Sequence, residues 1–331
     1  IDLFEDCLSM NAVNCRPPDN RAPTDHEIAC CWVKIINPTL AQYQPRVVIL
    51  FGASAISSVL GHRWPKDLGS VSRWRGWTIP DRELGAWICP MFHPSYVERE
   101  EKRKEVTTIW RQDLKRVLSK VDVPPPTWKD EGSLVQFPQS EDDLLSILQR
   151  IARGKEGDLA SFDYETTGLR PYTGAHRIVC ASVTTARATY AFMWPKSKQC
   201  LQAWKHLLRS NRVGKIAHNM QFEHMWSQVY AGVEVQNWAW DSMQAAHILD
   251  NRPKITGLKF QAFVHFGLVG YDSKIESYLR SVDPKNSNSP NRIEEFIERY
   301  GEREVLTYCG IDSLLAWKLA ALQMDQLGTR K

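Results

Sequence analysis

The run VDVPPPTWKDEGS at residues 121–133 sets three consecutive prolines before a polar stretch. Proline has no backbone N–H and disfavours a helical residue before it, so neither a helix nor a central strand continues through this run. A chain of 331 residues is long enough for two packed domains of ordinary size. The sequence therefore predicts one domain over residues 1–121, a proline-rich linker over 122–132 and a second domain over 133–331.

Both predicted domains alternate strand and helix patterns, as α/β proteins do. In the first, PRVVILFGASAISSVLG at 45–61 indicates a strand, a glycine turn and a helix of small residues, and WICPMFHPSYV at 87–97 indicates a second strand. In the second, SEDDLLSILQRIARG at 140–154 indicates a helix with a Ser cap. Strands follow in DLASFDYETTGL at 158–169 and RIVCASVTTARATYAFMW at 177–194, and helical patterns dominate thereafter.

The net charge, the apolar runs and the cysteines indicate which partners and which cellular compartment to expect. A formal net charge of +4 agrees with a nucleic-acid partner without requiring one. Apolar runs such as 47–51 are far shorter than the roughly 20 residues of a membrane span, so we expect a soluble protein with no membrane partner. Eight irregularly spaced cysteines and no signal peptide favour the cytoplasm of a bacterial or phage-infected cell. Because the chain opens on Ile1 rather than Met, we expect a fragment of a longer protein.

Two carboxylates lie two residues apart in the strand pattern ASFDYETTGL. Side chains alternate along a strand, so Asp163 and Glu165 are expected on one face, with Phe162 and Tyr164 in the core on the other. Like charges held this close favour a cation between them, and oxygen ligands favour Mg²⁺ or Mn²⁺. The alternative is that Asp163 ends the strand and Glu165 is solvated in a turn.

Two later segments place further polar groups at helical spacing. In EREVLTYCGIDSLLAWKLAAL, Tyr308 and Asp312 are four apart and share a helix face. In KIAHNMQFEHMW, a strand leads to a helix that begins near Asn219, with Glu223 one turn into it. Taken singly, Tyr308 would be a core residue and the two carboxylates solvated surface charges. Spacing alone does not establish that the segments meet.

Together, FDYETTGL, HNMQFE and YCGID resemble the motifs of the DEDD 3′-5′ exonucleases, in the subgroup with a Tyr in the last motif, as in the proofreading domains of family A DNA polymerases. WDSMQAAHILD and GLKFQAFVHFG resemble segments that follow the second motif in those domains. The resemblance covers residues 133–331 and implies a ribonuclease H-like fold with a mixed sheet. It implies removal of nucleoside monophosphates from single-stranded DNA 3′ ends.

The resemblance also implies roles for individual residues. Asp163, Glu165 and Asp312 would bind one Mg²⁺ or Mn²⁺ ion, and Asp163 and Glu223 would bind a second. Tyr308 would orient the attacking water. The family usually has Asp where this chain has Glu223, so we expect reduced or metal-shifted activity. Asn219 and Phe222 would position the helix and the terminal nucleotide. Thr166 and Leu169 would contact the last base.

The first domain resembles the iron–sulfur uracil-DNA glycosylases of family 4. The matching segments are NAVNCRPPDNRAPTDHEIACC, RVVILFGASA, RWRGW and FHPSYV. The resemblance implies a three-layer α/β/α domain in which Asn11 reads uracil, His93 stabilises the leaving base, and Cys15 and Cys31 are two of four cluster ligands. The ordinary alternatives are a turn residue, a loop histidine and packing cysteines.

This second resemblance is incomplete. The family's first motif and its other cysteine pair should precede Asn11, and Cys7 matches no ligand position. We therefore expect no uracil excision by this chain, and a 4Fe–4S cluster only if upstream cysteines exist in a longer protein. The domain is then expected to bind DNA or dock a partner. Candidate phosphate contacts, with ordinary surface arginines as the alternative, are Arg16, Arg21, Arg73 and Arg75.

Three hypotheses follow from the sequence. The first is a metal-dependent 3′-5′ exonuclease for proofreading or repair, as part of a larger phage or bacterial polymerase or beside a polymerase subunit. The second is a uracil-DNA glycosylase completed by residues upstream of Ile1. The third is a non-catalytic nucleic-acid-binding module, in which Glu223 and the incomplete first domain mark decay.

Overall fold

The computed structural model describes residues 5–286 and 288–329, which form two compact units. The N-terminal unit contains the residues up to Thr127 together with 252–254 and 262–269, and the C-terminal unit contains residues 128–251, 255–261 and 270 onward. Along the main chain the division falls between Thr127 and Trp128. No sequence feature predicts that the two short segments group with the N-terminal unit.

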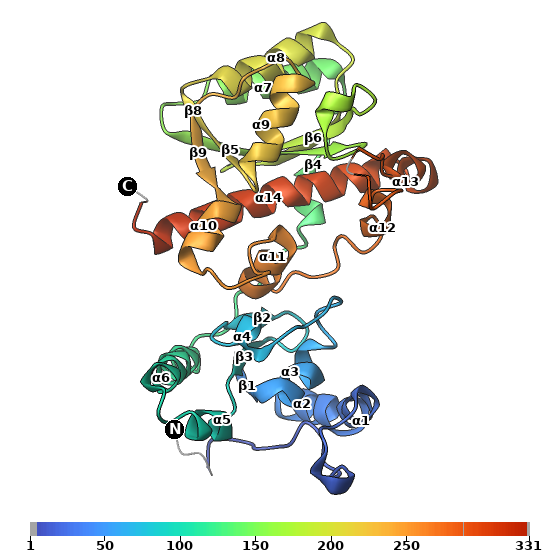
Figure 1. The fold of residues 1–331 in the computed structure, drawn as a ribbon. Helices are drawn as coiled ribbons and strands as arrows, with labels where there is room; N and C mark the ends of the chain where they lie inside the picture. Colours follow the sequence, from blue (N-terminus) through green and yellow to red (C-terminus); the bar gives the residue numbers. More distant parts are fainter. Residues whose placement is uncertain (1–4, 287, 330–331) are drawn as a thin grey trace. The chain divides into compact units, whose positions relative to one another are not determined.

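The N-terminal unit is built on a three-stranded sheet in the order β1-β3-β2, in which β1 and β3 are parallel and β2 is antiparallel. Trp87, Cys89 and Met91 on one face pack against α6, while α3 contacts β1 and β3. Figure 1 shows α6 and α3 on opposite sides of this pair of strands, which gives three layers. The elements are η1 (Pro18–Asn20), α1 (Asp25–Cys31), η2 (Trp32–Ile36), α2 (Asn37–Tyr43), β1 (Val47–Phe51), α3 (Gly52–Leu60), α4 (Val71–Trp74), β2 (Ile79–Asp81), β3 (Ala86–Met91), α5 (Pro94–Arg99) and α6 (Lys104–Leu118).

The C-terminal unit contains a six-stranded mixed sheet in the order β4-β7-β6-β5-β8-β9. The strand β5 pairs antiparallel with β6 and parallel with β8. The elements are η3 (Gly132–Leu134), β4 (Val135–Gln136), α7 (Glu141–Ala152), β5 (Asp158–Thr166), η4 (Pro171–Thr173), β6 (Ile178–Thr185), β7 (Thr189–Met193), α8 (Lys198–Arg209), β8 (Val213–Ala217), α9 (Met220–Val229), β9 (Trp238–Asp241), α10 (Ser242–Leu249), the first turn of α11 (Leu258–Phe266), α12 (Glu276–Leu279), α13 (Ile293–Tyr300) and α14 (Glu302–Gln326). The rest of α11, from Ala262 on, belongs to the N-terminal unit.

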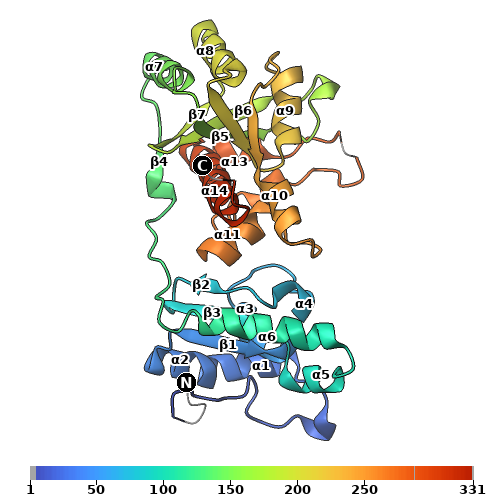
Figure 2. The same cartoon turned by 90° about the vertical axis from the view of Figure 1, so that its left-hand side faces the viewer.

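The two faces of β5 have different partners. Phe162 and Tyr164 are buried in the core cluster that includes residues of α7 and α8, as the alternation in the sequence predicts. The other face carries Ser161, whose hydroxyl donates to the carbonyl of Ser313 on α14 at 2.6 Å. In Figure 2, α7 and α8 lie on one side of this sheet and α14 on the other. The central strand therefore has an apolar face toward two helices and a polar face toward one.

The helix α14 crosses the polar face and contacts β5, β6, β7 and β8. The helix has 25 residues and contains an 18-residue stretch that is apolar enough to span a membrane by length and composition, but 72% of that stretch is buried inside the molecule. A helix that is apolar on every side is expected where it is surrounded by protein. The length and hydropathy of α14 are thus those of a core helix.

The helices α7 and α9 begin at the two residues that the sequence predicts, Ser140 and Asn219. Ser140 accepts a hydrogen bond from the backbone N–H of Asp143 at 3.2 Å and caps α7, as predicted. As predicted, α9 begins beside Asn219, which stands at its N-cap, but the Asn219 side chain makes no capping bond. Its φ of 75° explains the residue instead, because Asn tolerates the left-handed region better than most side chains do.

Candidate active site

Four carboxylates from three elements interact in the C-terminal unit. Asp163 and Glu165 come from β5, Glu223 from the first turn of α9 and Asp312 from the middle of α14. The negative charges of Asp163 and Asp312 act on both Glu165 and Glu223. The ligand atoms of Asp163, Glu165 and Cys309 all lie within 4.8 Å of one another. The structure thus brings together the carboxylates of all three sequence motifs.

Because the cluster is buried, ionisation of its carboxylates costs free energy unless a cation is bound. Desolvation raises the pKa of Asp163, Glu165 and Glu223 well above the usual range, and the neighbouring carboxylates raise each pKa further. Several buried carboxylates cannot all be ionised in the absence of a cation. Such a group therefore forms a strong site for a divalent cation that prefers oxygen ligands. The charge of the cluster and its oxygen chemistry both fit Mg²⁺ or Mn²⁺.

Glu223 supplies a second observation in favour of a metal. The residue is 2% exposed, and its Oε2 atom is buried without a hydrogen-bond partner among the described residues. A buried carboxylate oxygen that is left unpaired costs free energy, and it is rare in stable proteins unless a ligand satisfies it. The free acceptor fits coordination of an ion shared with Asp163.

Tyr308 lies one helical turn before Asp312 and is buried. Its hydroxyl oxygen accepts a hydrogen bond from the ammonium of Lys259 at 2.9 Å. Burial raises the pKa of Tyr308 well above its usual value, and the charge of Asp312 raises it further. The phenol therefore stays protonated at neutral pH, as a group that orients water by hydrogen bonding must.

Three residues beside the cluster were missed by the sequence reasoning. Lys259 of α11 contacts Asp312 and Tyr308, and the hydroxyl of Tyr271 donates to Asp312 Oδ1 at 2.6 Å. Cys309 places its Sγ atom 3.7 Å from Asp163 Oδ2, and burial raises the pKa of the thiol, which therefore stays neutral. The lone Lys in the apolar segment GLKFQAF was a usable signal for Lys259, whereas Tyr271 had none.

The remaining residues predicted to contact the nucleotide differ in their solvent exposure. Leu169 is 58% exposed just beyond β5, whereas Thr166 is buried and donates its hydroxyl proton to the carbonyl of Gly168 at 2.7 Å. Phe222 is partly buried and packs against the core cluster. Asn219, which precedes Glu223 in the same motif, is partly exposed. The predicted contacts of these four residues with the terminal nucleotide stay predictions.

The candidates in the N-terminal unit do not form a metal centre in the described structure. Asn11, Cys15 and His93 are exposed, and Cys31 is buried. The Nδ1 atom of His93 accepts the backbone N–H of Ser95 at 3.1 Å and so caps α5. Within residues 5–286 and 288–329, no three cysteines gather as metal ligands. The predicted roles in uracil recognition and cluster ligation remain predictions.

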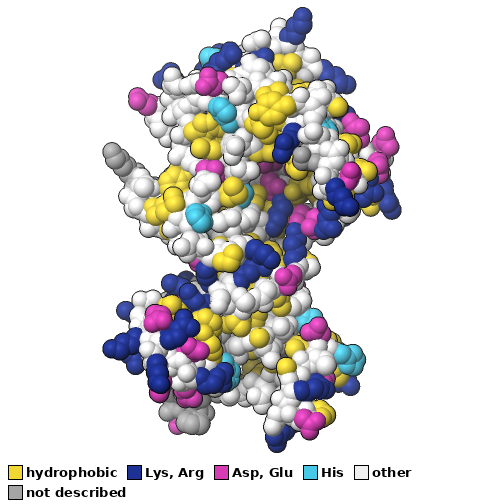
Figure 3. All heavy atoms as spheres, viewed as in Figure 1, with side chains coloured by type: hydrophobic (Ala, Val, Ile, Leu, Met, Phe, Trp, Pro, Cys, Tyr) yellow, Lys and Arg dark blue, Asp and Glu magenta, His cyan; other side chains and the backbone are white. Residues whose placement is uncertain are grey.

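The four arginines proposed as phosphate contacts have partners inside the N-terminal unit. Arg21 forms an ion pair with Glu27, and Arg75 forms one with Asp113. Arg73 donates to the carbonyl of Asp67, and Arg16 donates to the side chain of Asn20. On the face seen in Figure 3, basic and acidic side chains are interspersed over both units rather than gathered in one basic patch.

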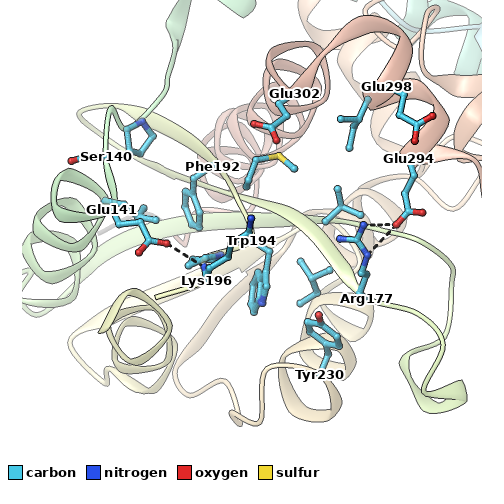
Figure 4. A pocket seen from close by; sticks show the side chains of 17 residues that line it. Ser140, Glu141, Arg177, Phe192, Trp194, Lys196, Tyr230, Glu294, Glu298 and Glu302 are labelled. Atoms are coloured by element: carbon cyan, nitrogen blue, oxygen red, sulfur yellow. Dashed lines mark hydrogen bonds and ion pairs between the residues drawn. The ribbon is translucent and has the colours of Figure 1, made fainter. Parts of the chain in front are cut away.

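A separate pocket of about 800 Å³ lies at the ends of β6 and β7, away from the four carboxylates. Figure 4 shows Glu294, Glu298 and Glu302 on one wall, with Arg177 bonded to Glu294 and Trp194 on the floor. None of the predicted site residues lines this pocket. Its carboxylates would repel a phosphate backbone, so it is a poor candidate for the nucleic-acid site.

Comparison with known proteins divides the chain in the same order as the sequence motifs. Residues 135–320, more than half of the chain, match the family model described as 3′-5′ exonuclease, and residues 3–115 match the uracil DNA glycosylase superfamily. A type-4 uracil-DNA glycosylase of Thermotoga maritima is 34% identical over 121 residues. That match covers 35% of this chain and only 56% of the glycosylase. Together with the two observed sheets, these matches confirm the predicted fold classes.

Two solved structures are similar to part of this chain at low sequence identity. RNase D of Trypanosoma brucei, in complex with GMP, is 12% identical with a TM-score of 0.43, covering 58% of this chain and 57% of that chain. NrnC of Brucella melitensis is 17% identical with a TM-score of 0.36, covering 52% of this chain and 74% of that chain.

Proposed function

Since the chain belongs to the 3′-5′ exonuclease family, we propose that its C-terminal unit hydrolyses the last phosphodiester bond of single-stranded DNA from the 3′ end, with two divalent ions, and releases nucleoside monophosphates. One observation carries this proposal: the carboxylates of the three motifs interact with one another in a buried cluster. A non-catalytic binding module does not need a cluster of buried carboxylates, which lowers the stability of the protein unless a cation binds to it.

The chain's own residues have distinct tasks in the proposed reaction. Asp163, Glu165 and Asp312 would hold one ion, and Asp163 and Glu223 would hold the other. Divalent ions in such a site polarise the phosphate, lower the pKa of the attacking water and stabilise the departing oxygen. The water oxygen bonds to phosphorus while the bond from phosphorus to the 3′ oxygen breaks, and that oxygen receives a proton.

Tyr308 would position the water in this scheme. Its hydroxyl remains protonated because burial and the charge of Asp312 raise its pKa, so it can donate to or accept from a water held at the cluster. Leu169, exposed at the end of β5, would contact the terminal base by apolar packing. These roles are consistent with cleavage at any sequence, because they contact phosphate, sugar and base faces rather than base edges.

DNA as the substrate, proofreading or repair as the role, and a polymerase as the partner belong to this proposal. The match of residues 3–115 to the uracil DNA glycosylase superfamily supports a DNA substrate. A polymerase domain or subunit would supply 3′ ends for proofreading. The proposed setting is the cytoplasm of a bacterial or phage-infected cell.

The test is release of nucleotides from a 5′-labelled DNA strand with Mg²⁺, Mn²⁺ or EDTA. We expect a ladder that shortens from the 3′ end with either metal, stops in EDTA and is lost in Asp163→Ala. Asp142→Ala, an exposed carboxylate in the first turn of α7, should cleave like the unchanged chain. Strand binding without degradation under both metals would instead favour the non-catalytic module.

A second candidate, uracil excision, rests on the match over residues 3–115. Base excision needs a closed pocket for the flipped base and a positioned water, and exposed Asn11 and His93 form only part of such a pocket. We expect no alkali-labile sites in uracil-containing DNA treated with this chain. Their appearance, and their loss in His93→Ala, would establish a second activity.

A further inference from the structure

Lys259 occupies a position that none of the exonuclease motifs accounts for. Its ammonium lies 2.7 Å from each carboxylate oxygen of Asp312 and 2.9 Å from the hydroxyl of Tyr308. It also lies 4.4 Å from the ring centres of both Tyr271 and Tyr308. The side chain is only 24% exposed. Two aromatic faces, a phenol and a carboxylate thus surround one partly buried cation.

The contacts of Lys259 use the oxygens that a metal would need. Asp312 Oδ1 accepts from both Lys259 and Tyr271, and Oδ2 accepts from Lys259. Mg²⁺ binds a carboxylate oxygen at about 2.0–2.1 Å, and an ammonium on the same carboxylate would stand close to that ion. Two cations at such a distance in a water-poor site repel each other strongly.

The other end of the cluster is arranged differently. Glu223 Oε2 is buried with no hydrogen-bond partner among the described residues, so it offers a free acceptor. The charge of Asp163 acts on Glu223, and neither Lys259 nor another cation of the described residues is among the groups that act on Glu223. A divalent ion can therefore bind there without first displacing an internal cation.

We infer that Lys259 is an internal cation that competes with a divalent ion for Asp312. This inference rests on the proposed function, since it takes the carboxylates as metal ligands. The ion shared by Asp163 and Glu223 binds first, and the position at Asp163, Glu165 and Asp312 fills only when the Lys259 ammonium moves away from Asp312. Lys259 thereby makes the two metal positions unequal, and it keeps the metal-free cluster folded by offsetting its charge.

The test is a Mn²⁺ titration of the whole chain, with free Mn²⁺ followed by electron paramagnetic resonance. The unchanged chain should show one tight and one weak class of site. Lys259→Met should tighten the weak class at least tenfold and leave the tight class within threefold. Lys259→Arg keeps a cation and should bind like the unchanged chain, as should Lys274→Met, which alters an exposed lysine paired with Glu304. Weak-class affinity that is equal or lower in Lys259→Met would overturn the inference.

A melting experiment covers the case in which removal of the lysine affects folding. In EDTA, Lys259→Met and the more polar Lys259→Gln should both melt below the unchanged chain, because the buried carboxylates lose their internal cation. Saturating Mn²⁺ should raise their melting temperatures more than that of the unchanged chain. An equal or smaller Mn²⁺-induced rise in both variants would contradict the inference.

The outcome is separable from that of the proposed function. Tighter Mn²⁺ binding in Lys259→Met, in a chain that never degrades DNA, would support the inference and count against the exonuclease. Full metal-dependent degradation with unchanged Mn²⁺ binding in Lys259→Met would support the exonuclease and overturn the inference.

Discussion

The carboxylate of Asp241 accepts the backbone N–H of Met220 at 3.0 Å and so ties the first turn of α9 to the end of β9. The same carboxylate accepts the N–H of Asn219 at 3.1 Å and of Met243 at 2.9 Å, the second of which caps α10. One side chain thus satisfies N–H groups at the starts of two helices. Because α9 carries Glu223, Asp241 also holds one wall of the carboxylate cluster.

Asp241→Ala should therefore lower both stability and metal affinity. Loss of a cap costs about 1 kcal/mol, and unpaired N–H groups at a second helix add a similar amount, so we expect the unfolding free energy of the C-terminal unit to fall by about 2 kcal/mol. Urea denaturation followed by tryptophan fluorescence measures this change. Asp142→Ala is the matched control and should change stability by less than about 0.5 kcal/mol. Equal midpoints for the two variants would show that the Asp241 contacts are not needed.

Glu223→Asp should change the metal preference of the nuclease. Mg²⁺ demands near-ideal octahedral geometry, whereas Mn²⁺ is more tolerant, so the longer Glu arm is expected to disfavour Mg²⁺. The Asp variant should raise the ratio of Mg²⁺-supported to Mn²⁺-supported degradation, and Glu223→Gln should weaken metal binding about tenfold or more. Rates in each metal, at matched concentrations on one labelled strand, give the ratio. A lower ratio in Glu223→Asp would contradict this account of the Glu.

The metal-free protein should lose stability as pH rises. The folded-state pKa values of Asp163, Glu165 and Glu223 are raised, so the folded state binds more protons than the unfolded state above about pH 4. The stability that these protons contribute is present below the unfolded pKa and is lost as pH rises through the folded pKa. In EDTA, Glu165→Gln should match the unchanged chain near pH 4 and become increasingly more stable toward pH 8.

Saturating Mn²⁺ should reverse the order of the two proteins in that experiment. The ion stabilises the ionised cluster of the unchanged chain, whereas the Gln variant lacks one ligand. Urea midpoints across pH in EDTA and in Mn²⁺ provide the measurement. A stability difference that does not change with pH would show that Glu165 does not titrate with a raised pKa.

Gly310→Ala should destabilise the packing of α14 on β4. A Cβ atom at position 310 would lie 2.5 Å from Cγ1 and 2.8 Å from Cγ2 of Val135. Overpacking of this kind costs about 1–3 kcal/mol. Val135→Ala removes both methyl groups, so the double variant should recover part of the loss, and a double-mutant cycle in urea gives the coupling. Additive single effects would mean that the two residues do not meet.

The carboxylate cluster was largely predictable because it depends on the regular spacing of side chains along one strand and one helix. Alternation along β5 placed Asp163 and Glu165 opposite the core, and four-residue spacing placed Tyr308 and Asp312 on one face of α14. Both follow from backbone geometry within a single element. That the three elements meet was accessible only through the resemblance to a family, since no local rule gives contacts between segments this far apart in sequence.

The partners of the cluster were not predictable from local patterns. Lys259 lies in an apolar helix where a single charge has no preferred partner until the tertiary structure brings Asp312 to it. Asp241 was hidden for the same reason, because it caps a helix that begins 21 residues earlier, at Met220. The helix start at Asn219 was predictable, but its left-handed backbone and the absence of a side-chain capping bond were not.

The position of α14 in the chain has a consequence for how a cell makes this protein. The polar face of the sheet is covered only when this last helix packs on β5 to β8, and Asp312 leaves the ribosome long after Asp163. During translation the sheet strands emerge with Ser161 still lacking its partner on α14 and with the acidic cluster incomplete. A nascent chain that is stopped before α14 therefore lacks Tyr308 and Asp312, so stalled synthesis leaves a fragment in which the carboxylate cluster cannot be completed.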